Sequence, residues 1–255
     1  GLKADYAYGQ KFWADEYRLN AKIFEYPKPV VSFLQGYTMG GGVGIGCHGS
    51  HRVVGDTSQI AMPEVGIGLV PDVGGSLMLA LAPDRLGEYL GTTASRMNAS
   101  DAIFAGFADL YIPEGKWPAL IEQLEVSGDP ACLVGEVPAE IGPIQSQMDA
   151  INTHFHGVSL SDVLTTLEND DSEFAQQTLK QLRRNCPLSM ACTIEMLHRL
   201  RGPSLTMAKA LDLEYRFTSR SMEHGDFIEG IRAAIIDKDR KPKWQFCDGA
   251  VPTAA

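Results

Sequence analysis

The sequence predicts an α/β protein followed by a helical region. Short segments of strand composition alternate with helical segments over the first 112 residues, which is the order of elements in α/β domains. Beyond that point proline, glycine and acidic residues become frequent, and helical spacing returns only near residue 158. We therefore expect an α/β core over 1–112, an irregular connecting region over 113–157 and a C-terminal helical region over 158–255.

The first half of the core is expected to contain a long helix and three short extended segments. Apolar residues recur at helical spacing over 10–25, and Pro27 and Pro29 end this helix. Strand composition between turn residues predicts the extended segments, at 30–34, 51–56 and 59–64. The glycine-rich stretch that follows the first strand is expected to form a turn at 36–39 and then a helix that begins within 40–42.

The second half of the core is expected to be helical. The segment 74–93 has helical spacing, and Pro83 within it suits the start of a second helix. The segment 98–109 has an amphipathic body, and Asn98 or Ser100 can cap its first turn.

Helical spacing also runs from 158 to 235 in the C-terminal region. Breaks are expected at Pro187 and at Gly202-Pro203, where proline cannot continue a preceding helix. The last residues, 248–255, show no apolar periodicity, and we expect a loose tail there.

Composition and charge exclude several classes of protein. The chain has 255 residues with 22 Lys+Arg and 32 Asp+Glu, a formal charge of −10, whereas nucleic-acid-binding proteins more often show a basic excess or stripe. No apolar run is long enough to span a membrane, and the first residues show no signal-peptide pattern. We therefore expect neither a nucleic-acid partner nor a membrane partner.

The cysteines and histidines give no sign of a disulfide framework or a metal site. The five cysteines are odd in number and scattered, without a C-x-x-C pair, so we interpret them as reduced thiols: Cys47, Cys132, Cys186, Cys192 and Cys247. His154 and His156 could contact one metal ion, but this spacing in a polar stretch more often arises by chance. No metal is expected.

The glycine-rich stretch "GYTMGGGVGIGCHG" has three possible explanations besides a flexible linker, which its apolar residues exclude. Gly44, Gly46 and Gly49 spell the dinucleotide-binding pattern G-x-G-x-x-G, but the preceding strand ends well upstream, which disfavours a nucleotide site. The glycines could instead allow a helix to pack closely on a strand. They could also leave the amides of a helix's first turn open to a carbonyl group, which would form one half of an oxyanion hole.

Two carboxylates in "AMPEVGIGLVPDVGG", Glu64 and Asp72, stand among apolar residues and glycines. Such surroundings tend to raise a carboxyl pKa, and two neighbouring carboxyls disfavour double ionisation. These properties suit a general acid–base pair or a carboxylate nucleophile. The alternative for Asp72 is a structural one, because aspartate at this position could cap the following helix.

The chain resembles the crotonase (enoyl-CoA hydratase/isomerase) superfamily, and within it most of all the 3-hydroxyisobutyryl-CoA hydrolases. The similar pieces are "FWADEYRLN", "KPVVSFLQGYTMGGGVGIG", "AMPEVGIGLVPDVGGSLMLAL", "ASDAIFAGFAD" and "LEYRFTSRSMEHGDFIEGIRAAIIDKDRKPKW". The resemblance implies a ββα-spiral core. It also implies an upstream strand and turn that supply a second oxyanion amide, and since no such segment precedes this core we expect the N-terminal part of that fold to be missing from the chain.

Transferred residue by residue, the resemblance implies roles for four positions. Gly41 would supply an oxyanion N–H, Glu64 would be the main catalytic carboxylate, Asp72 its partner, and Glu16 a substrate contact. Hydratases of the superfamily typically have glycine in place of Asp72 and a second catalytic glutamate where this chain has Gly44. The resemblance therefore favours thioester hydrolysis over addition of water by two glutamates.

The implied reaction is hydrolysis of 3-hydroxyisobutyryl-CoA, an intermediate of valine breakdown, with coenzyme A as part of the substrate and no separate cofactor. Two alternatives stay open: an enoyl-CoA hydratase or isomerase, and a non-catalytic acyl-CoA-binding protein. Arg240, Lys241 and Lys243 are candidates for contacts to the CoA phosphates, although a solvated basic segment explains them equally well. The resemblance implies the cytoplasm in a bacterium, the mitochondrial matrix in a eukaryote, and a possible homo-oligomer.

Overall fold

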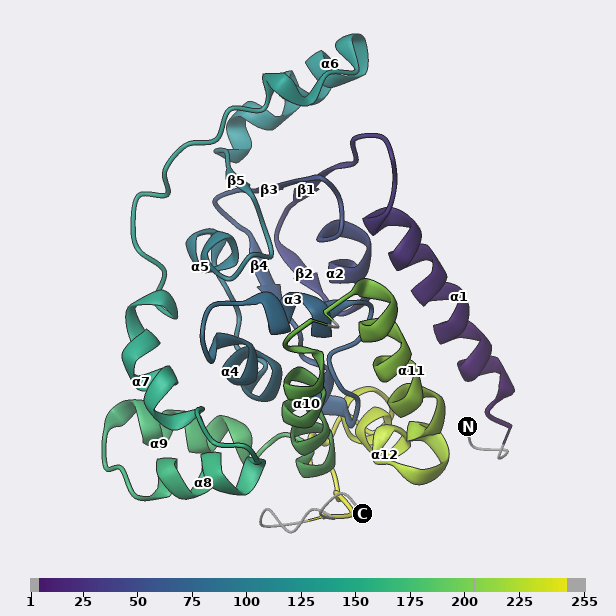
Figure 1. Cartoon of the computed structure of the whole chain (residues 1–255), viewed down its shortest axis with the longest axis vertical. Coiled ribbons are helices and arrows are strands. Elements are labelled where there is room, and N and C mark those ends of the chain that lie inside the picture. Colours follow the sequence, from purple (N-terminus) through teal and green to yellow (C-terminus); the bar gives the residue numbers. More distant parts are fainter. Residues whose placement is uncertain (1–4, 204, 247–255) are drawn as a thin grey trace.

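The computed structural model describes residues 5–203 and 205–246 (Figure 1). A long N-terminal helix is followed by four short strands and a short glycine-rich helix. Their bounds are α1 Ala7–Phe24, β1 Val31–Leu34, β2 Tyr37–Met39, α2 Gly41–Gly46, β3 His51–Val54 and β4 Gln59–Ala61. The helix that was expected over 10–25 and the three extended segments are confirmed.

The strands form two small parallel sheets. One has the order β1-β3-β5, with β5 at Leu110–Tyr111, and the other pairs β2 with β4. Parallel strands joined through helices confirm the expected α/β class. The turn expected over 36–39 is wrong in part, because Gly36 alone makes the turn in a left-handed conformation, with φ 59°. Tyr37 already pairs with Gln59 as the first residue of β2.

The remainder of the core is helical, as expected. It contains the 3₁₀ helix η1 Glu64–Ile67, α3 Gly75–Leu81, α4 Leu86–Thr93 and α5 Ala99–Phe104. The second helix of the 74–93 segment begins later than Pro83, because the chain turns there: Leu86 N–H donates to Pro83 O at 3.0 Å. Asn98 is the cap of α5, since its side chain accepts a hydrogen bond from Asp101 N–H at 2.9 Å.

The segment 113–157 is not irregular throughout, contrary to expectation. It contains two α-helices, α6 Trp117–Ser127 and α7 Met148–His154, and three 3₁₀ turns, η2 Glu114–Lys116, η3 Pro130–Cys132 and η4 Gln145–Gln147. Helix α6 buries only Trp117, and it stands apart at the top of Figure 1. A helix with no buried stripe shows no helical periodicity. Helix-forming residues and a proline in the first turn support it instead.

The C-terminal region is helical, as expected. Its elements are α8 Leu160–Glu168, α9 Glu173–Leu182, α10 Pro187–Leu200, α11 Met207–His224, α12 Phe227–Ile231 and the π-helical turn η5 Arg232–Ile236. Pro187 is the first residue of α10, a position where the missing proline N–H costs nothing. The expected tail at 248–255 lies outside the described residues.

One hydrophobic cluster joins the α/β part to the C-terminal helices. It includes Trp13 of α1, Val43 of α2, Leu79 of α3, Leu167 of α8 and Leu197 of α10. Helix α11 packs against both α1 and α3. Residues from the far end of the sequence thereby come to lie beside the segment that follows η1 (Figure 1).

The second half of the glycine-rich stretch is required for packing. A Cβ atom at Gly44 would lie 2.7 Å from Val73 Cβ, one at Gly46 would lie 2.6 Å from Leu34 Cδ2, and one at Gly49 would lie 2.8 Å from Val30 O. Real Cβ atoms do not approach so closely, so these three glycines serve close packing of α2 and the turn after it on their neighbours.

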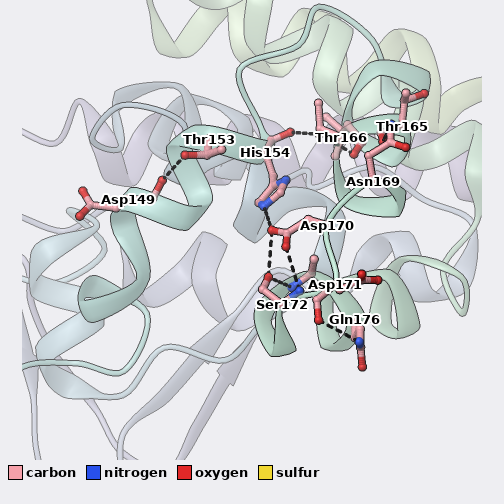
Figure 2. A network of polar contacts seen from close by, with 12 residues as sticks. Asp149, Thr153, His154, Thr165, Thr166, Asn169, Asp170, Asp171, Ser172 and Gln176 are labelled. Atoms are coloured by element: carbon pink, nitrogen blue, oxygen red, sulfur yellow. Dashed lines mark hydrogen bonds and ion pairs between the residues drawn. The ribbon is translucent and has the colours of Figure 1, made fainter.

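The histidines considered for a metal site have other partners. His154 Nε2 lies 2.8 Å from Asp170 Oδ2, and Figure 2 shows this pair linking α7 to the start of α9 through Ser172. His156 Nδ1 lies 2.6 Å from Thr153 O. Within the described residues no group of three or more His, Cys, Asp and Glu side chains could hold a metal ion.

The four cysteines within the described part of the chain are free thiols: Cys47, Cys132, Cys186 and Cys192. Cys247 lies outside the described residues. A search of residues 5–203 and 205–246 finds no helix that could cross a membrane.

Candidate active site

Glu64 opens η1 with a buried carboxylate that has no hydrogen-bond partner among the described residues. The residue is 5% exposed, and neither of its side-chain oxygens is satisfied. Burial raises the pKa of Glu64 well above its ordinary value, and the charge of Asp72 raises it further. A buried acid that nothing pairs or solvates is ready to exchange a proton with a molecule bound beside it.

Asp72 lies in the turn between η1 and α3, and it is also buried. Its Oδ2 accepts a hydrogen bond from Tyr17 Oη of α1 at 2.8 Å. Burial and, next, the charge of Glu214 raise the pKa of Asp72 to about 8, although the Tyr17 bond acts in the opposite direction. Because Glu64 and Asp72 each disfavour ionisation of the other, the pair retains a proton at a pH where ordinary carboxyl groups have lost theirs.

The alternative role of Asp72 as a helix cap belongs instead to Glu214 of α11. Gly74 N–H donates to Glu214 Oε2 at 2.8 Å, and Ser76 N–H donates to Glu214 Oε1 at 3.1 Å. The Ser76 hydroxyl donates to the same Oε1. These are the first amides of α3, so Glu214 caps the helix while the side chain of Asp72 bonds to Tyr17.

Gly41 and Glu16 lie at the same place. Gly41 is the first residue of α2, no side chain caps this helix, and the first amides of a helix have no intrahelical partner. A Cβ at Gly40 would lie 3.1 Å from Glu64 Oε1, and one at Gly41 would lie 3.2 Å from Glu16 Oε1. The half-buried Glu16 also acts electrostatically on Asp72. The structure therefore brings together all four residues singled out from the sequence.

Gly44, where the resemblance places the second glutamate of hydratases, has no room for a side chain. A Cβ there would lie 2.7 Å from Asn20 Nδ2 and 2.7 Å from Val73 Cβ. Asn20 Nδ2 donates to Gly44 O at 3.0 Å, which fixes this contact. The site is therefore built around Glu64 and Asp72, without a carboxylate from α2.

The largest cavity of the described residues, about 660 Å³, lies elsewhere. It is bounded by α8, α10 and the chain at 242–246, and none of the four site residues lines it. Lys243 lies at its edge, and the side chains of Arg240, Lys241 and Lys243 are exposed to solvent. Their exposure agrees with a solvated basic segment, and a role in contacting CoA phosphates stays a prediction.

Sequence reasoning missed Tyr17, Glu214 and Thr218. Tyr17 counted as an apolar position of the first helix, and Glu214 and Thr218 lie more than 130 residues from Asp72 along the chain. No spacing rule connects such positions. Helix α11 had been noted for its resemblance alone, and the packing of α1 and α11 against each other places these side chains around Asp72.

Comparison with known proteins places the site in context. Residues 2–251 match the model of the enoyl-CoA hydratase/isomerase family. Among curated proteins, the chain is 36% identical to the mitochondrial 3-hydroxyisobutyryl-CoA hydrolase of Rattus norvegicus, over 96% of this chain and 66% of the relative. It is 35% identical to the corresponding protein of Homo sapiens, over 93% of this chain and 64% of the relative. The chain thus spans just under two-thirds of the length of these relatives.

Solved structures give a second comparison. An enoyl-CoA hydratase from Rhodobacter sphaeroides 2.4.1 has a TM-score of 0.94 and 54% identity, covering 99% of this chain and 74% of that one. A carnitinyl-CoA dehydratase from Mycobacterium thermoresistibile has a TM-score of 0.90 and 39% identity, covering 98% and 73%. These likenesses confirm the expected crotonase-like fold. The names of the relatives divide between thioester hydrolysis and the addition or removal of water.

Proposed function

The chain belongs to the enoyl-CoA hydratase/isomerase family, and on that premise we propose that it acts as an acyl-CoA thioester hydrolase. The proposed substrate is 3-hydroxyisobutyryl-CoA, and the products are 3-hydroxyisobutyrate and free coenzyme A. Sequence similarity to hydrolases of that name supports this choice. Because the chain spans 66% of the length of the first of these relatives, the assays below use the full-length gene product that carries it.

The observation that carries the proposal is the pair of buried carboxyl groups beside an uncapped helix start. Glu64 is unpartnered and lies next to Gly40 and Gly41, and Asp72 interacts with it from the turn before α3. Binding alone does not require buried acids, since their burial costs free energy that only a reaction makes useful. This argues against a non-catalytic acyl-CoA-binding protein.

In the proposed reaction the thioester carbonyl oxygen accepts a hydrogen bond from Gly41 N–H, and oxyanion donors of this kind contribute about 3 kcal/mol. Ionised Glu64 takes a proton from water as the water oxygen bonds to the carbonyl carbon. The C–S bond then breaks, and the thiolate takes a proton from Asp72. Transfer of a proton from Glu64 to Asp72 restores the starting state. The Glu16 carboxylate is placed to accept a hydrogen bond from the substrate hydroxyl.

Direct attack of Glu64 on the carbonyl carbon is a second route to the same products. It forms an anhydride that water then cleaves. A single turnover in ¹⁸O-labelled water, with enzyme in excess, separates the two routes. Activation of water places the label in the first product molecule. Attack by Glu64, with water then cleaving the anhydride at the glutamyl carbonyl, leaves the label in the enzyme.

Hydration or dehydration of an acyl-CoA is the second candidate function. The names of the two similar solved structures favour it, one of them at 54% identity. The crowding of Gly44 by Val73 and Asn20 opposes it, because a two-glutamate mechanism needs a carboxylate there. With Glu64 as the only acid–base group, an isomerase would still be possible.

Product analysis tests the proposal. The full-length protein is incubated separately with 3-hydroxyisobutyryl-CoA and with the matching enoyl-CoA, and free thiol and loss of the enoyl thioester are followed. The proposal expects thiol release from the hydroxyacyl substrate and no net hydration of the enoyl substrate. Hydration without thiol release would establish the second candidate, and binding without either reaction would establish an acyl-CoA-binding protein.

A further inference from the structure

Helix α11 holds the segment around Asp72 by its backbone. The Glu214 carboxylate, which is fully buried, accepts hydrogen bonds from Gly74 N–H, Ser76 N–H and the Ser76 hydroxyl. All three donors lie within four residues of Asp72. A charged acceptor with three donors is among the strongest restraints that a side chain can place on a neighbouring backbone.

The backbone that Glu214 restrains is strained. Val73 has φ 55° and Gly74 has φ 81°, so two consecutive residues are left-handed, and a β-branched residue rarely adopts that conformation. His48 Nε2 donates to Val73 O at 2.7 Å, on the side opposite the amide of Gly74. The left-handed turn is therefore held on one side by His48 and on the other by Glu214.

Helix α11 also reaches the side chain of Asp72. Thr218, one helical turn after Glu214, has its Oγ1 3.2 Å from Tyr17 Oη. Because Tyr17 has one hydroxyl proton and donates it to Asp72, Thr218 donates to Tyr17. One face of α11 thus fixes both the backbone after Asp72 and the orientation of its side-chain donor.

We infer that Glu214 is a positioning residue for the reaction: it holds the strained Val73–Gly74 turn so that Asp72 faces Glu64, and its negative charge favours the protonated form of Asp72. This rests on the proposed hydrolase function only for its kinetic part. Glu214 would not contact the substrate, because its two oxygens are occupied by the backbone and side chain of Gly74 and Ser76.

The electrostatic part depends on every group that faces Asp72. These are Glu16 and Tyr17 from α1, Glu64 from η1 and Glu214 from α11, while His48 reaches the turn through Val73 O. After burial, the charge of Glu214 is the largest influence that raises the pKa of Asp72. Removing this charge should therefore lower the pH at which Asp72 loses its proton.

The test compares Glu214→Gln with Glu214→Asp. Glutamine keeps the size but removes the charge, so kcat should fall roughly tenfold to a hundredfold, as misplacement of a reacting group does, with KM nearly unchanged. The limb of the pH–rate profile that reports Asp72 should move to lower pH. Aspartate keeps the charge but shortens the reach, so kcat should fall while that limb stays in place. Glu223→Gln, an exposed carboxylate of the same helix, is the matched control and should leave both unchanged.

A titration without substrate keeps this inference separate from the proposed function. Difference infrared spectroscopy follows the carboxyl band of Asp72, identified by its loss in Asp72→Asn, and its midpoint should fall in Glu214→Gln. If Glu214→Gln does not fold, Ser76→Ala removes one of the three donors and should lower kcat to a smaller extent. Wild-type kcat and an unmoved Asp72 band in Glu214→Gln would overturn the inference. Absence of thiol release by the wild type, with the band still moving, would overturn the proposed function alone.

Discussion

Two regions of the molecule bury a glutamate and treat it in opposite ways. At the contact of α4 with α10, Glu88 is 0% exposed, and Arg201 donates to both of its oxygens, the bond to Oε2 measuring 2.7 Å. Arg85 donates to Oε1 at 2.9 Å, and His198 Nε2 lies 3.3 Å from the same oxygen. At η1, Glu64 is almost as deeply buried and has neither a cation nor a donor.

The difference shows that the surroundings of a buried carboxylate, and not its burial, decide what it does. Burial by itself would raise the pKa of Glu88, but bonds from His198 and Arg201 outweigh burial and lower the pKa to about 2. Burial and the charge of Asp72 both raise the pKa of Glu64. Glu88 is therefore permanently charged and joins two helices, whereas Glu64 can change its protonation state, as a reacting group must.

The largest expected effect follows replacement of Glu64. Glu64→Gln should lower kcat by about a thousandfold or more, in the upper part of the range for lost acid–base catalysis. Its Tm should not fall, because glutamine removes a charge repelled by Asp72 and breaks no hydrogen bond. Thiol release and thermal unfolding are measured on one sample. Full activity in the variant would place the catalytic carboxylate elsewhere.

The next effect concerns Gly41. Gly41→Val should lower kcat by about a hundredfold, as loss of an oxyanion donor does, because the side chain blocks the carbonyl and pushes against Glu16 Oε1. Gly42→Val is the matched control, since a Cβ there meets only Thr38 Cγ2, at 3.8 Å. Equal activity of the two folded variants would remove Gly41 from the site.

Replacement of Glu88 should affect stability alone. Glu88→Gln leaves Arg201 and Arg85 without their acceptor, at a cost of about 1–3 kcal/mol in the free energy of unfolding. Both arginines are partly exposed, so the cost is lower than for a fully buried pair. Denaturant unfolding checks the value, and KM for the acyl-CoA should stay constant. A large kinetic effect without loss of stability would contradict the structural role of Glu88.

The smallest effect is a difference in how pH acts on the two regions. The pKa of Glu88 is lowered from 4.5 to about 2, so its stabilising contribution is present above pH 4.5 and is lost as the pH falls through 2. The pKa of Asp72 is raised from 3.8 to about 8, so its contribution is present below pH 3.8 and is lost as the pH rises through 8. The Tm of Asp72→Asn relative to the wild type should therefore increase from pH 4 to pH 8. The deficit of Glu88→Gln should shrink below pH 4.5.

Local chemistry in the sequence predicted much of this structure. Pro27 and Pro187 mark where a helix stops and where another starts, and Asn98 caps α5, because each effect acts within a few residues. The glycine-rich stretch was the harder case, since both of its explanations hold in different halves. Gly44, Gly46 and Gly49 serve packing, while Gly41 stands at an open helix start.

The rest depends on tertiary packing. Glu64 and Glu88 both stand in apolar sequence, and no local pattern shows that Arg201, 113 residues farther on, pairs with one of them alone. The cap of α3 comes from Glu214, although Asp72 is the nearer candidate by sequence. Helix α6 shows the same limit, because a helix that buries one residue leaves no periodic trace.

The rate of thiol release by Asp72→Asn, measured beside its melting curve, tests most directly whether the two carboxyl groups act as a pair. Asparagine keeps the shape and the bond from Tyr17 but cannot exchange a proton at this position. We expect a fall in kcat of about a hundredfold or more, as for loss of an acid–base group, with Tm unchanged or higher. An unchanged rate would contradict the pair, leave Asp72 with a structural role, and weaken the case for a hydrolase within this family.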